Sequence, residues 1–190
     1  TGAWGLFSTA LGCLEEVLVA LEFVLPDGCV WGSRHRPRAS AGPDLRQLFL
    51  GSEGTLGIVT EVTFSLRPLP EAQQGQSLCF DEFSAGLEAI RRFVAAGWAP
   101  PVVRLYDAAE SKRNFAEVCP DGKAMLLLLH EGPAAALEVE VAAVRALCES
   151  AGGRTSDPGV VDEWLGHRNQ VPGFRGFLEN GSGVDTIEVA

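Results

Sequence analysis

Three glycines at a spacing of three residues, Gly51, Gly54 and Gly57, punctuate the stretch GSEGTLGIVTEVTFSLRPLP at residues 51–70. Glycine accepts positive φ and has no side chain, so the main chain of such a loop can approach an anion or a flat ring closely. The alternating apolar residues that follow predict a buried strand, which ends where Pro68 and Pro70 interrupt the pattern. The stretch therefore predicts a backbone-rich loop anchored by a strand of the core.

The spacing of these glycines differs from that of two common nucleotide-binding motifs. A Rossmann fingerprint has G-x-G-x-x-G between a strand and a helix, whereas this loop has G-x-x-G-x-x-G and leads into a strand. A Walker loop needs Gly-Lys-Ser/Thr, which this stretch lacks. Spacing alone leaves an ordinary glycine-rich turn and a cofactor loop equally open.

The composition is that of a globular protein rather than a nucleic-acid-binding one. The chain has 190 residues, 46% of them hydrophobic, and a formal net charge of -10, which leaves room only for a local cationic pocket. No apolar run approaches the roughly 20 residues of a membrane span, and no signal peptide opens the chain. The composition is rich in arginine and poor in lysine, and we expect a cytoplasmic bacterial protein. The sequence starts at Thr1 in a loop-like segment, which suggests a fragment.

The five cysteines are far apart in the sequence. They form no CxxC pair and no Cys/His cluster with metal-ligand spacing, so no metal site is predicted. Cys13, Cys29, Cys79 and Cys148 have apolar neighbours, and we therefore expect buried, free thiols.

Two groups of elements are expected, separated by the glutamine-rich stretch at 69–76. The first is a hairpin over residues 14–33, with its turn at 26–28, and a short helix at 44–49. The second begins with a strand at 77–80 and a helix at 81–97, with Asp81 as N-cap and an apolar stripe of Phe83, Leu87, Ile90 and Val94. Further strands are expected at 101–107, 124–132 and 185–189, and helices at 108–115, 133–151 and 161–168. This order predicts an α+β fold with helices on one face of a sheet.

The segment GPDLRQLFLGSEGTLGIVTEVTFSLRPLPE resembles the end of the FAD-binding domain in the flavoprotein family typified by vanillyl-alcohol oxidase, in which a GSEGTLGI-like stretch wraps the flavin. Residues 1–19 are similar to an upstream segment of that family, although Gly2 and Trp4 stand where arginine and serine are common. The resemblance implies FAD as cofactor. It assigns cofactor contacts to Thr1, Gly2, Ala3, Trp4, Glu53, Gly54, Thr55, Leu56, Gly57, Ile58 and Val59.

The same resemblance implies a fold and its domains. Residues 1–70 correspond to the C-terminal part of a VAO/PCMH-type FAD-binding domain. Residues 71–190 correspond to the N-terminal part of a ferredoxin-like α+β cap domain that binds substrate.

The segment PVVRLYD, residues 101–107, distinguishes branches of the family. Alkyl-dihydroxyacetone-phosphate synthases have an arginine in an R-L-M-D context, whereas lactate and glycolate dehydrogenases have a glutamate at that place. Arg104 therefore favours the synthase branch, which implies a catalytic role for Arg104 and substrate binding by Arg175. A guanidinium fork suits a phosphate or carboxylate, whereas pairing of Arg104 with Asp107 or Glu110 is the structural alternative.

The resemblance implies an FAD-dependent enzyme that exchanges the acyl group of acyl-dihydroxyacetone phosphate for a fatty alcohol in ether-lipid synthesis. Two alternatives stay open: an FAD-linked dehydrogenase of a 2-hydroxy acid, and a truncated scaffold without catalysis. A small-molecule or lipid-phosphate substrate is implied. A peripheral membrane contact and a homodimer are compatible with the resemblance, and the sequence specifies neither.

Overall fold

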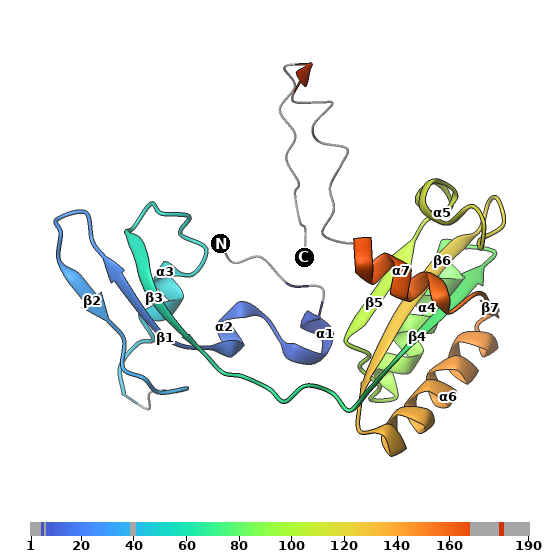
Figure 1. The fold of residues 1–190 in the computed structure, drawn as a ribbon, viewed down its shortest axis with the longest axis horizontal. Helices are drawn as coiled ribbons and strands as arrows, with labels where there is room; N and C mark the ends of the chain where they lie inside the picture. Colours follow the sequence, from blue (N-terminus) through green and yellow to red (C-terminus); the bar gives the residue numbers. More distant parts are fainter. Residues whose placement is uncertain (1–4, 6, 39–40, 168–178, 181–190) are drawn as a thin grey trace.

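The computed structural model describes residue 5, residues 7–38 and 41–167, and residues 179–180. Figure 1 shows two lobes, each built around its own antiparallel sheet and joined by the extended segment 65–71. The short helices α1 (Ser8–Leu11) and α2 (Leu14–Val17) lie between the two sheets. In the described residues, no helix is both long and apolar enough to cross a membrane.

The first lobe contains the predicted hairpin, although residues 14–17, which were included in it, form helix α2 instead. Strand β1 (Leu18–Val24) lies between β2 (Val30–Gly32) and β3 (Ile58–Phe64), and both neighbours pair with it in antiparallel fashion. The short helix α3 (Arg46–Phe49) precedes the glycine loop, as expected. Phe23 of β1 is buried and packs against Trp31 of β2, with ring centroids 4.9 Å apart, so the hairpin contributes the core of this lobe.

The prediction that the strand after the glycine loop is buried is wrong for the described chain. The side chains of Ile58, Val59, Val62 and Phe64 are 71%, 47%, 43% and 44% exposed. A three-stranded sheet with one short helix has too little apolar material to cover both of its faces. β3 is instead held through backbone pairing with β1.

The second lobe is a four-stranded antiparallel sheet with strand order β5-β6-β4-β7. Its strands are β4 (Ala72–Phe80), β5 (Val102–Tyr106), β6 (Ala124–Gly132) and β7 (Arg154–Thr155). This is the order of a ferredoxin-like sheet, which confirms the predicted α+β architecture. The inner strand β6 contributes seven consecutive buried residues, from Ala124 to His130.

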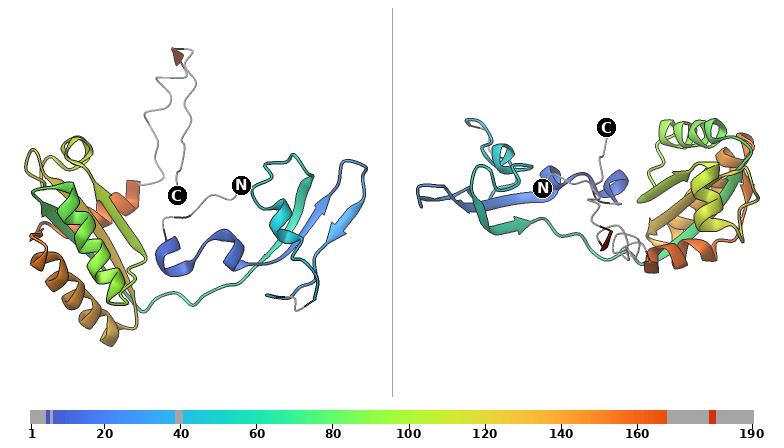
Figure 2. Two further views of the ribbon diagram at one scale, coloured as in Figure 1. Left: turned by 180° about the vertical axis from the view of Figure 1, so that it is seen from behind. Right: turned by 90° about the horizontal axis from the view of Figure 1, so that it is seen from above.

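Helices cover both faces of this sheet. The long helices α4 (Phe83–Ala95) and α6 (Ala134–Ser150) lie side by side on one face, as the left view of Figure 2 shows. Helices α5 (Ala108–Phe115) and α7 (Gly159–His167) pack against the other face through Phe115, Val160 and Val161. The helices lie close to the residue ranges that the sequence predicts, but the prediction that they cover one face of the sheet is wrong, because α5 and α7 cover the second face. The strand expected at 185–189 lies outside the described residues.

The glutamine-rich stretch is part of a strand rather than a linker. Gln73, Gln74 and Gln76 belong to β4 and pair with β6 along their whole length. Gln76 is buried, and its amide donates a hydrogen bond of 2.8 Å to the Val141 carbonyl of α6. A buried glutamine with a hydrogen-bond partner can belong to the core, and Gln76 links β4 to α6.

The apolar stripe predicted on α4 is wrong for three of its four residues, since only Ile90 packs against the core. Phe83, Leu87 and Val94 are 44%, 55% and 51% exposed, whereas the buried residues of this helix are Gly86, Ala89 and Phe93. The N-cap is Glu82 rather than Asp81; the Asp81 carboxylate pairs instead with Lys123 and Arg154.

All five thiols are free, as expected, but they are not all buried. Cys79, Cys119 and Cys148 are buried, whereas Cys29 is exposed and Cys13 is half-buried. Cys29 follows the turn at Asp27 and Gly28, and its backbone N–H donates to the Asp27 carboxylate. A residue fixed at a turn by its backbone does not need to bury its side chain.

Candidate functional site

The glycine loop lies on the surface of the first lobe, between α3 and β3. Its backbone enters the left-handed region at Gly51, Glu53 and Gly54, with φ angles of 74°, 50° and 81°. Thr55 closes a turn on the Ser52 carbonyl, which accepts from the Thr55 N–H at 2.9 Å and from its hydroxyl at 2.6 Å. The loop therefore has a defined shape that its glycines make possible.

The main chain of this loop offers hydrogen-bond donors to the outside. The N–H groups of Glu53, Gly54 and Leu56 find no acceptor within the described part of the chain, and all three residues are exposed. Three unpaired N–H groups on exposed residues within one short loop suit an anion or the polar edge of a ring. Of the seven residues assigned to the cofactor, 53–59, all are exposed except Gly57, which is half-buried.

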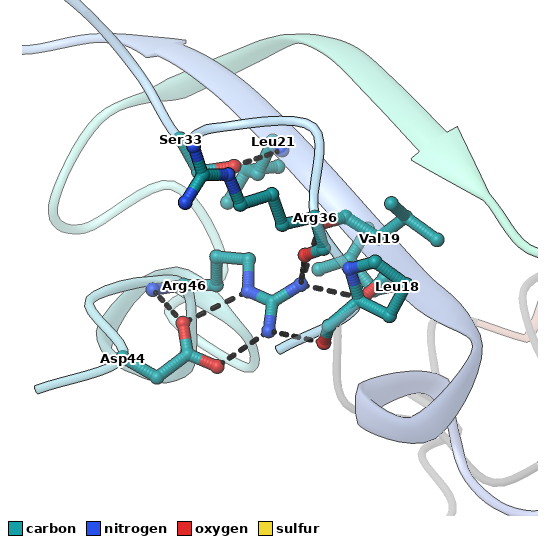
Figure 3. A network of polar contacts seen from close by, with 8 residues as sticks. Leu18, Val19, Leu21, Ser33, Arg36, Asp44 and Arg46 are labelled. Carbon is teal, nitrogen blue, oxygen red and sulfur yellow. Dashed lines mark hydrogen bonds and ion pairs between the residues drawn. The ribbon is translucent and has the colours of Figure 1, made fainter. Parts of the chain in front are cut away.

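A buried arginine that the sequence analysis missed holds this region together. Figure 3 shows the Arg46 guanidinium donating hydrogen bonds to the carbonyls of Leu18, Val19 and Arg36 and to the Asp44 carboxylate. The carbonyl of Pro37 accepts a further bond of 3.1 Å. Arg46 is 8% exposed, and its ion pair with Asp44 measures 2.7 Å. It ties the loop at 34–38 and helix α3 to the start of β1.

The charge of Arg46 also acts on its partner. Hydrogen bonding from the guanidinium lowers the pKa of the Asp44 carboxyl, so this carboxylate stays ionised at neutral pH. The sequence signal was an aspartate two residues before an arginine, directly after a proline, which is typical of a short helix start.

Arg104 lies on β5, the strand at one edge of the second sheet. Its side chain is exposed, and its Cα is opposite that of Leu127 on β6. The two carboxylates proposed as its structural partners are engaged elsewhere. Asp107 accepts a hydrogen bond of 2.8 Å from the Glu110 N–H at the start of α5, and Glu110 pairs with Arg113 at 3.4 Å. The positive charge of Arg104 is therefore not neutralised by these two neighbours.

Aromatic residues surround the face of the sheet that carries Arg104. Tyr106, two residues further along β5, packs edge-on against Phe115, with ring centroids 5.0 Å apart. Trp164 of α7 and Phe7 belong to the same apolar cluster. Helix α1 contacts β5, so the chain just after residues 1–4 reaches the strand that carries Arg104.

The remaining predicted site residues lie outside the described part of the chain. These are the four cofactor residues at 1–4 and the substrate residue Arg175. In the residues that are described, no group of three or more His, Cys, Asp or Glu side chains has a metal-binding arrangement.

Comparison with known proteins gives a consistent set of relatives. The family model for "FAD linked oxidases, C-terminal domain" matches residues 69–190. The uncharacterized FAD-linked oxidoreductase YgcU of Escherichia coli (strain K12) is 36% identical over 133 residues, which are 70% of this chain and 27% of that protein. The alkyldihydroxyacetonephosphate synthase of Caenorhabditis elegans is 39% identical over 107 residues, which are 56% of this chain and 18% of that protein.

Two further comparisons cover more of the chain. The glycolate oxidase subunit GlcD of Bacillus subtilis (strain 168) is 29% identical over 150 residues, 76% of this chain and 32% of that protein. A solved structure of an alkyldihydroxyacetonephosphate synthase superposes with a TM-score of 0.78 at 25% identity, covering 94% of this chain and 36% of that one. The chain thus spans about a fifth to a third of the length of these curated relatives.

Proposed function

The chain belongs to the family of FAD-linked oxidases, C-terminal domain, and from this premise we propose that it is part of an enzyme resembling alkyldihydroxyacetonephosphate synthase. FAD is the cofactor of this family. The proposed reaction replaces the acyl group of acyl-dihydroxyacetone phosphate by a fatty alcohol. The observation that carries the proposal is the exposed Arg104, whose neighbouring carboxylates are engaged elsewhere.

The glycine loop is the proposed cofactor contact of the first lobe. Its outward N–H groups at Glu53, Gly54 and Leu56 hold and orient the flavin by backbone, and Thr1–Trp4 supply a second contact. When bound, FAD supplies the reactive ring for the chemistry. Arg46 has a positioning role, because it fixes the backbone next to this loop.

Arg104 is the proposed anion-binding and charge-stabilising residue of the second lobe. A phosphate monoester carries about 1.5 to 2 negative charges near neutral pH, and a guanidinium binds two of its oxygens at once. The same fixed charge stabilises negative charge that develops during the reaction. Arg175 is proposed as a second cation for the substrate. The proposed domain division, residues 1–70 and 71–190, assigns the two roles to separate units.

A second candidate function is the oxidation of a 2-hydroxy acid by an FAD-linked dehydrogenase. It is supported by the glycolate oxidase subunit of Bacillus subtilis, which matches 76% of this chain. In that case Arg104 binds the carboxylate of the substrate by the same fork geometry. The two candidates differ in whether the flavin is reduced by its substrate.

A spectroscopic experiment separates the two candidates. The longer protein that contains this chain is purified with FAD, and its visible spectrum is recorded under anaerobic conditions with D-lactate, with glycolate, or with acyl-dihydroxyacetone phosphate and a fatty alcohol. The proposal expects ether product and free fatty acid with no net flavin reduction in the last mixture. Flavin bleaching by either hydroxy acid, with no ether product, would overturn it.

A matched pair of variants tests Arg104 in the same assay. Arg104→Gln is expected to lower the rate by about 100-fold, the usual loss on removing one charge-stabilising donor. Arg113→Gln is the control, because Arg113 is an exposed arginine on α5 that pairs with Glu110. Equal rates for the two variants would remove Arg104 from the mechanism.

A further inference from the structure

We propose that Tyr106 and Trp164 complete, together with Arg104, a subsite that binds an anionic oxygen group on the second sheet. The proposal rests on the proposed function in one respect: it places this subsite within the substrate site. Tyr106 donates a hydrogen bond to the anion, Arg104 supplies the charge, and Trp164 orients the tyrosine.

The two residues on β5 point to the same side of the sheet. Side chains alternate along a strand, so Arg104 and Tyr106 share a face with Val102, and that face carries the cluster containing Phe115 and Trp164. Their partners on β6, Leu127 and Met125, belong to the same face. Arg104 and Tyr106 are therefore direct neighbours along one edge strand.

The surroundings of Tyr106 fix the direction of its hydroxyl group. Burial raises the pKa of Tyr106, while hydrogen bonding by the Trp164 side chain and the positive charge of Arg104 act to lower it. An indole N–H is a donor only. Trp164 packs against the same cluster as Tyr106, so the tyrosine oxygen can accept from the indole N–H and still donate its own O–H proton to a second partner.

A tyrosine hydroxyl is protonated at neutral pH, and burial raises the pKa of Tyr106 further, so this hydroxyl remains a donor. A phenol O–H beside a guanidinium offers two kinds of donor to one phosphate or carboxylate. The edge-on contact with Phe115 restricts the phenol ring and favours one orientation. Glu110 is the nearby carboxylate that raises the pKa of Tyr106, and its pairing with Arg113 limits its repulsion of an anion.

Tyr106 adds a hydrogen-bond donor next to the guanidinium on this strand. The extra donor therefore predicts tighter binding of the anionic group here than Arg104 alone provides.

Binding of inorganic phosphate tests the subsite without any turnover. The longer, FAD-loaded protein is dialysed against radiolabelled phosphate as wild type and as Tyr106→Phe, Arg104→Gln and Arg91→Gln variants. We expect the phosphate Kd to rise about tenfold in Tyr106→Phe, as for loss of one hydrogen bond to a charged group, and at least tenfold in Arg104→Gln. Arg91→Gln, which changes an exposed arginine of α4 that pairs with Glu88, should bind like the wild type. Unchanged binding by Tyr106→Phe would overturn the proposal.

A titration of Tyr106 provides the second readout. The ultraviolet difference spectrum between wild type and Tyr106→Phe isolates its ionisation from that of other tyrosines. Arg104→Gln should raise the pKa of Tyr106, because a nearby positive charge is lost. Bound phosphate should raise it in the wild type and leave it unchanged in Arg104→Gln. An identical Tyr106 titration with and without Arg104 would show that the two groups do not share a site.

The same binding experiment with D-lactate separates this proposal from the proposed function. If D-lactate displaces bound phosphate and its Kd depends on Tyr106 and Arg104 in the same way, the proposed subsite is supported and the proposal of a phosphorylated substrate is rejected. If neither anion depends on Tyr106 while the protein still makes the ether product, the proposed function stands and the subsite falls.

Discussion

Gly57 lies so close to Val24 that a Cβ atom on Gly57 would fall 2.6 Å from the Val24 carbonyl oxygen. That carbonyl belongs to the end of β1, at the point where β3 begins to pair with it. Gly57→Ala should therefore push the two strands apart and lower the free energy of unfolding by about 1–3 kcal/mol. Urea unfolding measures this change, and flavin fluorescence in the longer protein should show weaker FAD binding.

Gly32→Ala is the control for this prediction. An added Cβ at Gly32, on β2 of the same sheet, has no heavy atom within 4 Å. Its unfolding curve should match the wild type. Equal stability of the two variants would mean that the contact between Gly57 and Val24 does not restrict the loop.

Arg46→Met should destabilise the first lobe. Methionine has a similar volume but leaves the Asp44 carboxylate and four main-chain carbonyls without the guanidinium. We expect a loss of about 2–3 kcal/mol in urea unfolding, because buried polar groups lose their partners. Arg36→Gln is a matched control, since Arg36 takes part through its carbonyl and not through its side chain. A similar loss in both variants would contradict the anchoring role of Arg46.

The stability of the second lobe should fall as the pH drops from about 7.5 to 5.5, around the ordinary histidine pKa of about 6.5. His130 is fully buried between β6 and α6. Its Nδ1 lies 2.8 Å from the Glu140 carboxylate, and its Nε2 lies 3.3 Å from the Gln76 side-chain oxygen. Burial lowers the pKa of His130, with Arg145 acting in the same direction and Glu140 opposing. The unfolded chain then binds a proton that the folded chain does not, so protonation favours unfolding.

Urea unfolding at several pH values checks this sign. His130→Gln should flatten the pH dependence, whereas His167→Gln, which changes an exposed histidine of α7, should leave it as in the wild type. If stability rises on acidification instead, the pairing with Glu140 outweighs burial and the predicted direction is wrong.

Thiol labelling should separate the five cysteines into fast and slow groups. Cys29 is exposed and should react first, whereas burial raises the pKa of Cys119 and Cys148 to about 12. The thiolate is the reactive form, so these two should react only after unfolding. A chromogenic disulfide reagent measures both phases, and Cys29→Ser should remove the fastest one. A fast phase that survives in Cys29→Ser would place the exposed thiol elsewhere.

Much of the fold follows from local patterns in the sequence. The hairpin around residues 26–28 and the run AMLLLLHEG of β6 were predictable, because turn residues and continuous apolar runs report directly on local structure. The glycine loop was found for the same reason, since positive φ at Gly51 and Gly54 has a direct sequence signal. The alternation of strands and helices predicted an α+β fold, whereas the ferredoxin-like architecture was implied by the family resemblance.

The errors arose where packing, not pattern, decides burial. On α4 the large residues Phe83 and Leu87 suggested the inner face. The helix instead approaches the sheet through Gly86, where a Cβ would lie 2.6 Å from Leu105. Gln76 was read as part of a linker because a buried glutamine looks polar until its partner Val141 is known.

The candidate site was only partly predictable for a similar reason. Arg104 and the glycine loop carry motifs, but Tyr106 and Trp164 are 58 positions apart, and no sequence spacing connects them. Arg46 was missed because its four carbonyl partners come from segments that only the fold brings together.

The backbone of the edge strand β5 fixes the spacing between Arg104 and Tyr106. Residues two positions apart on a strand are about 6.6 Å apart along its axis. The Cα atoms of Arg104 and Tyr106 therefore keep this spacing whatever side chains they carry. A substitution at either position therefore changes one side chain and leaves the spacing between the two positions as it is.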